Sequence, residues 1–516
     1  MAHEVDHLKM ANPGVRGEWR TNADWKTACY PSADDITTLQ RLHAAESRSN
    51  ARVLIKGGTI ISMDPSVGDL VKGDLLITGG KISAIAADLG EAAANADVVV
   101  NATGMVVVPG FHDTHRHCWQ GQMRRLIPDV STLGEYMATT HGLLALHYRP
   151  EDIYLGNLIS GLGAIDAGIT TLMDFSHNPR SLGHAEAAIA AHADTGIRAI
   201  WACCAAFQGV LTLDWPNELV NLKKRFFATD DQLLTMRLGL MGVPASEVDT
   251  TLTPERLAFA RNLGISISTD GVIGDPASAA IEACGKAGVL GPDLTLIHCT
   301  ALTERSWKYI ADSGTTVSLA ATSDAQLGIG ASIPPIQLAL DHGIQPSLSI
   351  DVEISLSYDM FTQMRVVLNT QHMLSLNRRY LGDEHYPEAI STRDVLRYAT
   401  IEGARANGLA SKSGSLTPGK EADIVLIDAT ALNAMPLNNA VGTVVSGSDS
   451  RNIDTVFIGG KVKKWRGVVL GHDPKKLNEA LVKSRDYLFE KTKYPFDIFS
   501  KGVDFHQSAE EAVRGY

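Results

Sequence analysis

The sequence lacks the features that mark secreted, membrane-spanning or nucleic-acid-binding proteins. Its six cysteines form no CxxC pair, so a disulfide framework is not expected, and reduced thiols favour a cytoplasmic location. No apolar run reaches the roughly 20 residues that a membrane span needs, and the mixed charge of the first 20 residues does not fit a secretory signal. Lys and Arg number 46 against 58 Asp and Glu, without a basic block, which argues against nucleic acid and membrane surfaces as partners.

What the sequence does contain is the composition of a large globular protein with more than one folding unit. Its 516 residues are 45% hydrophobic and 20% charged. Residues 51–108 and 411–473 share short β-branched runs broken by GG turns, including ITGGK in the first and IGGK in the second. This recurrence predicts one small composite β-sandwich domain formed by both chain ends. Residues 1–50 are expected to be an irregular extension, and residues 474–516 a helix and a polar tail.

The central part of the chain, residues 109–410, alternates short apolar runs with amphipathic helical patterns. Near-continuous apolar strands between such helices indicate a parallel sheet covered on both faces. Eight such units predict an α/β fold, a distorted (β/α)8 barrel. An open doubly wound sheet is the runner-up, but no GxGxxG turn follows the first strand. The expected strands lie within residues 106–113, 168–177, 196–205, 236–243, 264–271, 294–302, 315–322 and 345–353.

Polar residues stand where several of these strands end, which is where a barrel places its reactive groups. His115 and His117 alternate along the first strand, so both imidazoles face the same way, as two metal ligands would. His298 ends the sixth apolar run and Asp351 the eighth, while His177 ends the second. Their coincidence on one rim predicts a metal site.

Three segments carry a family resemblance over residues 51–475. PGFHDTHRH resembles the PGFxDxHxH signature of the amidohydrolase superfamily, VLRYATIEGARANGL resembles a helix near its end, and GSLTPGKEADIVLID resembles its closing β segment. The match looks closest to the branch that contains atrazine chlorohydrolase, guanine deaminase and cytosine deaminase. The resemblance implies one Zn or Fe ion and hydrolytic attack on a C–N or C–Cl carbon, usually in a heteroaromatic ring.

The resemblance also implies roles for particular residues. His115 and His117 fall on metal ligands, and Asp351 falls on the residue that is both ligand and general base. His298 falls on the histidine that orients water or polarises the substrate. A metal that acidifies its water, with Asp351 to take the proton and His298 to stabilise charge, is coherent chemistry.

The fifth strand departs from the branch pattern. Ser268 stands where the third ligand histidine belongs, Gly271 stands where a glutamate often follows, and no histidine occurs between His192 and His298. Three explanations stay open at this point. Asp270 could supply the missing ligand, His298 could become a ligand itself, or the metal could be weakly bound or absent.

Substrate contacts are expected from residues near the same rim. An aromatic ring, an amide and a guanidinium following the first strand could stack on and hydrogen-bond a flat ring. After the seventh strand, Asp324 and Gln326 are expected to cap the next helix rather than to bind substrate. The candidate substrate-binding residues are Trp119, Gln120, Arg124, His177 and Ser268.

These patterns predict a hydrolase of small cyclic or heteroaromatic substrates with Asp351 as its general base. The alternative is a metal-free or metal-poor isomerase, lyase or cyclase on the same scaffold, using Asp351, His298 and Asp270 as acid–base groups. A non-catalytic binding protein ranks last. The expected partner is a small-molecule substrate, and the family-level expectation is a homo-oligomer.

Overall fold

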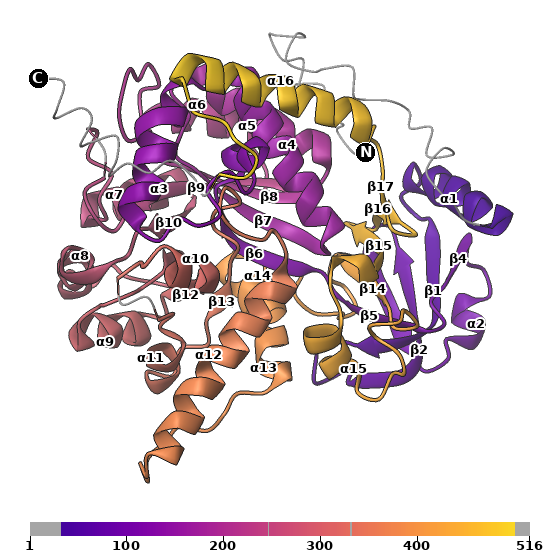
Figure 1. Ribbon diagram of the computed structural model, residues 1–516. Coiled ribbons are helices and arrows are strands. Elements are labelled where there is room, and N and C mark those ends of the chain that lie inside the picture. The colour runs from indigo at the N-terminus through magenta and orange to yellow at the C-terminus, as the bar shows by residue number, and fades with distance from the viewer. Residues whose placement is uncertain (1–31, 246, 331–332, 501–516) are drawn as a thin grey trace, which may run out of the picture.

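The computed structural model describes residues 32–245, 247–330 and 333–500, which form two sheets and their covering helices. The eight-stranded sheet forms a barrel, and the nine-stranded sheet lies beside it (Figure 1). The latter combines indigo strands from the start of the chain with gold strands from its end. The predicted barrel with a separate β unit from both chain ends is confirmed.

The barrel strands are parallel and follow one another in chain order from β6 to β13. Their residues are almost all buried, because the barrel interior packs against one face and helices against the other. The strands are β6 (Phe111–Arg116), β7 (Ile169–Ser176), β8 (Arg198–Cys203), β9 (Leu234–Met241), β10 (Ser266–Asp270), β11 (Leu294–Ile297), β12 (Thr316–Leu319) and β13 (Ser347–Leu348).

Helices connect the barrel strands and cover them. Those between the strands are α3 (Leu133–Met137), α4 (Pro150–Asp166), α5 (Leu182–Thr195), α6 (Leu219–Phe226), α7 (Pro254–Leu263), α8 (Gly274–Lys286), α9 (Glu304–Ser313), α10 (Ala321–Gln326) and α11 (Ile336–Asp341). After the last strand come α12 (Met360–Tyr380), α13 (Thr392–Arg397) and α14 (Gly403–Ala406). In the described part of the chain, no helix combines the length and apolar character that crossing a membrane requires.

Backbone bonds close the barrel at the first and last strands. The Asp351 amide donates to the carbonyl of His115 at 2.9 Å, and the His117 amide donates to the carbonyl of Asp351 at 2.9 Å. Asp351 thereby pairs as a parallel bridge with Arg116, at the end of β6. The closure brings two distant parts of the sequence, both carrying predicted site residues, into direct contact.

The second sheet is assembled around the two IxGGK turns. Gly79, Gly80, Gly459 and Gly460 all have positive φ, which only glycine adopts freely. The turns lie against each other so closely that a Cβ on Gly460 would meet the Gly80 Cα at 2.6 Å. The strands are β1 (Arg52–Ile61), β2 (Asp69–Thr78), β3 (Lys81–Ala86), β4 (Val98–Asn101), β5 (Met105–Pro109), β14 (Ile424–Asp428), β15 (Ile453–Ile458), β16 (Lys461–Trp465) and β17 (Val468–Val469).

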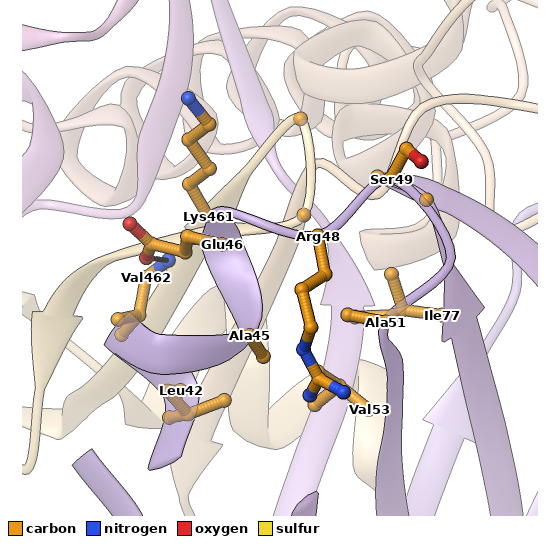
Figure 2. Close-up of a pocket in the computed structure, with 14 residues that line it drawn as sticks. Leu42, Ala45, Glu46, Arg48, Ser49, Ala51, Val53, Ile77, Lys461 and Val462 are labelled. Atoms are coloured by element: carbon orange, nitrogen blue, oxygen red, sulfur yellow. Dashed lines mark hydrogen bonds between the residues drawn. The ribbon is translucent and has the colours of Figure 1, made fainter. Parts of the chain in front are cut away.

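The predicted extension before residue 51 is not irregular where the structure describes it. Helix α1 (Ala33–Glu46) begins at a Ser32 cap and buries Leu39, Leu42 and Ala45 against the second sheet. Figure 2 shows the end of α1 beside the glycine turns, where Glu46 accepts a hydrogen bond from the Val462 amide at 3.0 Å. The sequence analysis missed this helix because its apolar positions are few and its mean hydropathy is low.

The other elements outside the barrel are short, apart from one long helix. They are α2 (Gly90–Ala93), α15 (Ala440–Gly442) and α16 (Pro474–Thr492), the last confirming the helix expected after residue 474. α16 packs on α4, where Ser484 Oγ donates to Asp152 at 2.7 Å. The expected polar tail after residue 500 lies outside the described residues, and the predicted domain limits remain our proposed division of the chain.

The expected first strand, VVVPGFHD (residues 106–113), is divided between two sheets. Val106–Val108 belong to β5 and pair with β14 in the second sheet, whereas the first barrel strand begins at Phe111. Gly110 lies between them, packed against Thr170 of β7. The expected strand at 106–113 is therefore split at the point where the two sheets meet.

Replacing Gly110 with alanine is expected to destabilise the protein by about 1–3 kcal/mol, the usual cost of overpacking. The added Cβ would lie 2.0–2.6 Å from Thr170 side-chain atoms, so one of the two strands must shift. Urea unfolding measures the loss. Gly134→Ala is the control, because its Cβ would meet only Thr132 Oγ1 at 3.9 Å, and equal stability of both variants would contradict the packing argument.

Candidate active site

The ends of three barrel strands, β6, β10 and β13, bring two histidines and two aspartates together. Asp351 Oδ1 lies 3.1 Å from Nε2 of both His115 and His117. Asp270, at the end of β10, places Oδ1 3.6 Å from His115 Nε2 and Oδ2 3.5 Å from His117 Nε2. All four side chains are buried. The sequence prediction that these residues share one rim agrees with this geometry.

These spacings fit a metal ion. A tetrahedral ion with bonds of about 2.0–2.1 Å places its ligand atoms about 3.3–3.4 Å apart. The separations between the imidazole nitrogens and the two carboxylates span 3.1–3.6 Å. Imidazole nitrogen and carboxylate oxygen are both ordinary zinc ligands. The residues present are thus able to hold a metal.

Neighbouring groups fix the orientation of these side chains. His117 Nδ1 donates to the carbonyl of Phe175 at 3.1 Å, which leaves Nε2 facing the carboxylates. Ser323 Oγ donates to Asp351 Oδ2 at 2.5 Å. His298 and Asp351 both have positive φ, 73° and 66°, a conformation that non-glycine residues adopt only when the surrounding structure requires it.

His298 lies beside this group but has a different set of partners. Its Nδ1 lies 2.7 Å from Asp324 Oδ1 and its Nε2 lies 3.2 Å from Asp270 Oδ1. Asp351 Oδ2 is farther from Nε2, at 3.9 Å. Asp324 is buried within α10, so it positions His298 instead of capping the helix as the sequence analysis expected.

The charges of the site hold one another in their ionised forms. Burial alone would raise the pKa of Asp270 and Asp351, but the surrounding histidines outweigh it and hold both below the usual range. Burial would likewise lower the pKa of His298, yet Asp324, Asp270 and Asp351 raise it well above its ordinary value. Against the effect of burial, Asp351 and Asp270 also raise the pKa of His117, so the carboxylates favour the protonated forms of both His117 and His298.

A cavity of about 240 Å³ opens onto this group. His117, Asp270, His298 and Asp351 form its floor, and its upper walls are mainly apolar. Burial lowers the pKa of His141 to about 3 and that of His177 well below the usual range, so both rings are neutral. The wall residues are Leu133, Tyr136, Met137, His141, His177, Phe207, Met241, Val243, Pro244, Ala245, Ile273, Leu327, Ile329 and Val352.

The candidate substrate-binding residues fall into two groups. His177 lines the cavity, and behind it Trp119 Nε1 donates to His177 Nδ1 at 3.1 Å. Gln120 is fully buried and donates to the hydroxyl of Tyr136, a wall residue, at 2.6 Å. Trp119 and Gln120 therefore act on the cavity through His177 and Tyr136.

Arg124 and Ser268 do not line this cavity. Arg124 forms an ion pair with the buried Glu353 and donates to the carbonyl of Ile159 at 2.9 Å. Ser268 lies within β10 and accepts a hydrogen bond from Arg237 at 3.2 Å. The structure thus places Asp270, not Ser268, at the rim end of the fifth strand.

Several cavity residues had no signal in the sequence analysis. His141 belongs to an irregular helical turn after α3, and Phe207 lies in the loop after β8. Ser323, which contacts Asp351, follows the seventh strand, where its position at the rim could have indicated it. The loop residues could not have been found in that way, because loop conformation sets which of them face the cavity.

His112, near the start of β6, has a structural role away from the cavity. It is fully buried, with Nε2 3.1 Å from Ser413 Oγ, and burial lowers its pKa to about 3. Since the unfolded chain has a pKa of about 6.5 there, the unfolded state binds more protons between pH 6.5 and 3, and stability falls as pH falls.

We expect acidification from pH 6.5 to pH 5 to remove about 2 kcal/mol of stability through His112 alone. In His112→Gln the stability lost between pH 6.5 and pH 5 should be smaller by this amount, because glutamine does not titrate. Urea unfolding at the two pH values measures it, with the exposed His43→Gln as control. An unchanged pH dependence in His112→Gln would show that His112 does not stay neutral in the fold.

Comparison with known proteins places this site in a family. Residues 106–463 match the model of the Amidohydrolase family. The 5'-deoxyadenosine deaminase of Methanosarcina mazei is 27% identical over 458 residues, covering 85% of this chain and 98% of that protein. The 5-methylthioadenosine/S-adenosylhomocysteine deaminase of Caldicellulosiruptor saccharolyticus is 26% identical over 441 residues, covering 84% and 96%.

Solved structures show the same fold. An adenosine deaminase from Xanthomonas campestris with bound zinc superposes with a TM-score of 0.70 at 19% identity, covering 85% of this chain and 99% of that one. Atrazine chlorohydrolase from Arthrobacter aurescens, complexed with zinc, gives 0.70 at 20% identity, covering 84% and 100%.

Together, the family match and the rim site define an enzyme of the hydrolase class that acts on carbon–nitrogen bonds. The chain belongs to the amidohydrolase family. The resemblance predicted from the HxH motif and the closing β segment is thereby confirmed.

Proposed function

We propose that the protein is a hydrolytic deaminase of a small heteroaromatic amine. Water adds to the ring carbon that carries the amino group, a C–O bond forms, the C–N bond breaks, and ammonia leaves. The observation that carries this proposal is the convergence of two histidines and two carboxylates, three of which (His117, Asp270 and Asp351) line a mainly apolar cavity. The deaminase names of the relatives support it.

We further propose that one zinc or iron ion is held by His115, His117, Asp270 and Asp351. Asp270 is the better third ligand than His298, because its two oxygens lie 3.6 Å and 3.5 Å from Nε2 of His115 and His117, close to the spacing of ligand atoms around one ion. When bound, such an ion supplies a Lewis acid and lowers the pKa of water toward neutrality. With Asp270 as a ligand, the site does not need the histidine that Ser268 replaces on the fifth strand.

The protein's own groups then divide the proton transfers between them. Asp351 is ionised, faces the cavity floor and accepts a proton from the attacking water. His298, held by Asp324, donates a hydrogen bond toward the substrate and stabilises negative charge that develops on the ring. The apolar walls exclude bulk water, which strengthens these interactions.

Ammonia release from a substrate panel tests the proposal. The panel holds adenosine, 5'-deoxyadenosine, 5'-methylthioadenosine, guanine, cytosine and aminated and chlorinated s-triazines. We expect at least one amine to be hydrolysed with a kcat/KM above about 10⁴ M⁻¹ s⁻¹, the lower end for enzymes on their own substrates. Absence of turnover across the panel, with zinc or iron added, would overturn the deaminase assignment.

Two further expectations are kept as proposals. All five cysteines in the described residues are free and buried, which is compatible with the cytoplasmic location that we propose. The homo-oligomeric state is a family-level expectation, and sizing by light scattering would test it.

A further inference from the structure

The cavity walls point to a narrower substrate class, an inference that rests on the proposed deaminase function. We propose that the substrate is a heteroaromatic amine whose ring nitrogen accepts a hydrogen bond from Nε2–H of His177. We propose also that its ring carries an apolar substituent, so that ribosylated bases are poor substrates.

The first step is the tautomer of His177. Indole nitrogen is only a donor, so the 3.1 Å contact between Trp119 Nε1 and His177 Nδ1 requires a lone pair on Nδ1. A ring that accepts at Nδ1 carries its hydrogen on Nε2. Trp119 therefore makes His177 a hydrogen-bond donor through its other nitrogen.

The second step is where that donor lies. The His177 ring stacks on His117, with centroids 4.1 Å apart and planes 2° from parallel. One of its nitrogens lies within 4.8 Å of an Asp270 oxygen, and the ring lines the cavity. Among the described residues, His177 Nε2 has no hydrogen-bond partner. A donor fixed beside the reactive group, without a protein acceptor, is suited to a ring nitrogen of the substrate.

The third step is the chemistry of the remaining wall. Asp270 and Asp351 are the only carboxylates among the described lining residues, and both are committed to the floor. Tyr136 accepts from Gln120 at 2.6 Å and its hydroxyl lies 3.5 Å from His141 Nε2, so these polar groups already have protein partners. Apart from His177, the other upper-wall side chains are aliphatic, aromatic or sulfur-containing. Ribose hydroxyls placed here would lose water without gaining partners, which is costly, whereas an alkyl or aryl group would be favoured.

Cavity size agrees with a compact ligand. The volume of about 240 Å³ lies below the roughly 300–1,000 Å³ of sites for drug-sized molecules. A ring with a short apolar substituent is better matched to it than a nucleoside with a long 5'-substituent. This distinguishes the chain from relatives named for 5'-deoxyadenosine and S-adenosylhomocysteine.

Matched substrate pairs test the apolar wall. We would compare kcat/KM of the metal-loaded enzyme for 9-butyladenine against 5'-deoxyadenosine, and for 1-butylcytosine against cytidine. The butyl compound is expected to be preferred by at least about tenfold in the pair that is turned over. Equal or better turnover of the nucleoside overturns this inference and leaves the deaminase function standing. If no compound in either pair releases ammonia, the proposed substrate class is overturned. The substrate panel described under the proposed function then tests separately whether the protein is a deaminase.

The donor role of His177 has its own test. Deaza analogues of the better substrate, each with one ring nitrogen replaced by C–H, should lose about tenfold in wild-type kcat/KM at the contacted position. His177→Phe should lower kcat/KM for the parent ring and bring the parent-to-deaza ratio close to one. Phe207→Leu, which changes the same wall without removing a donor, should keep the wild-type ratio. A ratio unchanged in His177→Phe would show that His177 is structural only.

Discussion

Replacing Asp351 with asparagine is expected to lower kcat/KM for ammonia release by about 10²–10⁴-fold, the range of a lost general base. The carboxylate lies 3.1 Å from Nε2 of both His115 and His117, the proposed ligands, and accepts from Ser323. Asparagine keeps the size of the side chain but is not a proton acceptor at neutral pH. The loss should therefore fall on turnover.

The fold should tolerate this change. Barrel closure at Asp351 uses its backbone amide and carbonyl, which asparagine retains. The residue has φ of 66°, and asparagine is among the few residues that adopt this region readily, so alanine would be the poorer choice. Asp312→Asn, an exposed change on α9, is the control. Turnover in Asp351→Asn within about threefold of wild type would exclude Asp351 as the base.

Asp270→Ala is expected to lower metal affinity by at least about 100-fold and to abolish most turnover. Changes in the groups that merely orient metal ligands already cost 10–100-fold, and this change removes a ligand itself. Metal titration with a chelating indicator measures affinity, and the ammonia assay measures turnover. Circular dichroism would check that the barrel is retained.

Ser268→Ala is the matched control on the same strand. It removes the oxygen that accepts from Arg237, so we expect a stability loss of about 0.5–1.5 kcal/mol with metal affinity unchanged. Comparing the two variants shows which of the two positions on the fifth strand, 268 or 270, supplies the third metal ligand. If Ser268→Ala loses the metal and Asp270→Ala keeps it, Asp270 is not the third ligand and the proposed ligand set is wrong.

Much of the fold was predictable because its signals are periodic or local. The apolar strand runs, the IxGGK turns and the HxH alternation each depend on neighbouring residues. Helix α1 was missed because packing against the second sheet, not its own sequence, stabilises it. The split of VVVPGFHD between two sheets was also unpredictable, since it depends on the pairing of β5 with β14, more than 300 residues away.

The site shows the same limit. Strand-end position alone indicated His115, His117, His298 and Asp351. The choice between Ser268 and Asp270 needed the register of β10, since both residues share one face and only the end of the strand reaches the rim. Trp119 and Gln120 were predicted to bind substrate, but neither lines the cavity. They contact its wall residues His177 and Tyr136, an arrangement that depends on tertiary contacts.

The most direct test of the central claim is metal content measured together with ammonia release. Protein purified without chelators or a metal-binding tag would be analysed by inductively coupled plasma mass spectrometry, then stripped and reloaded. We predict about one equivalent of zinc or iron per chain, with turnover lost on stripping and restored on reloading. Ammonia release at an unchanged rate from metal-free protein would contradict a hydrolytic metal site, and would favour acid–base chemistry by Asp351, His298 and Asp270 alone.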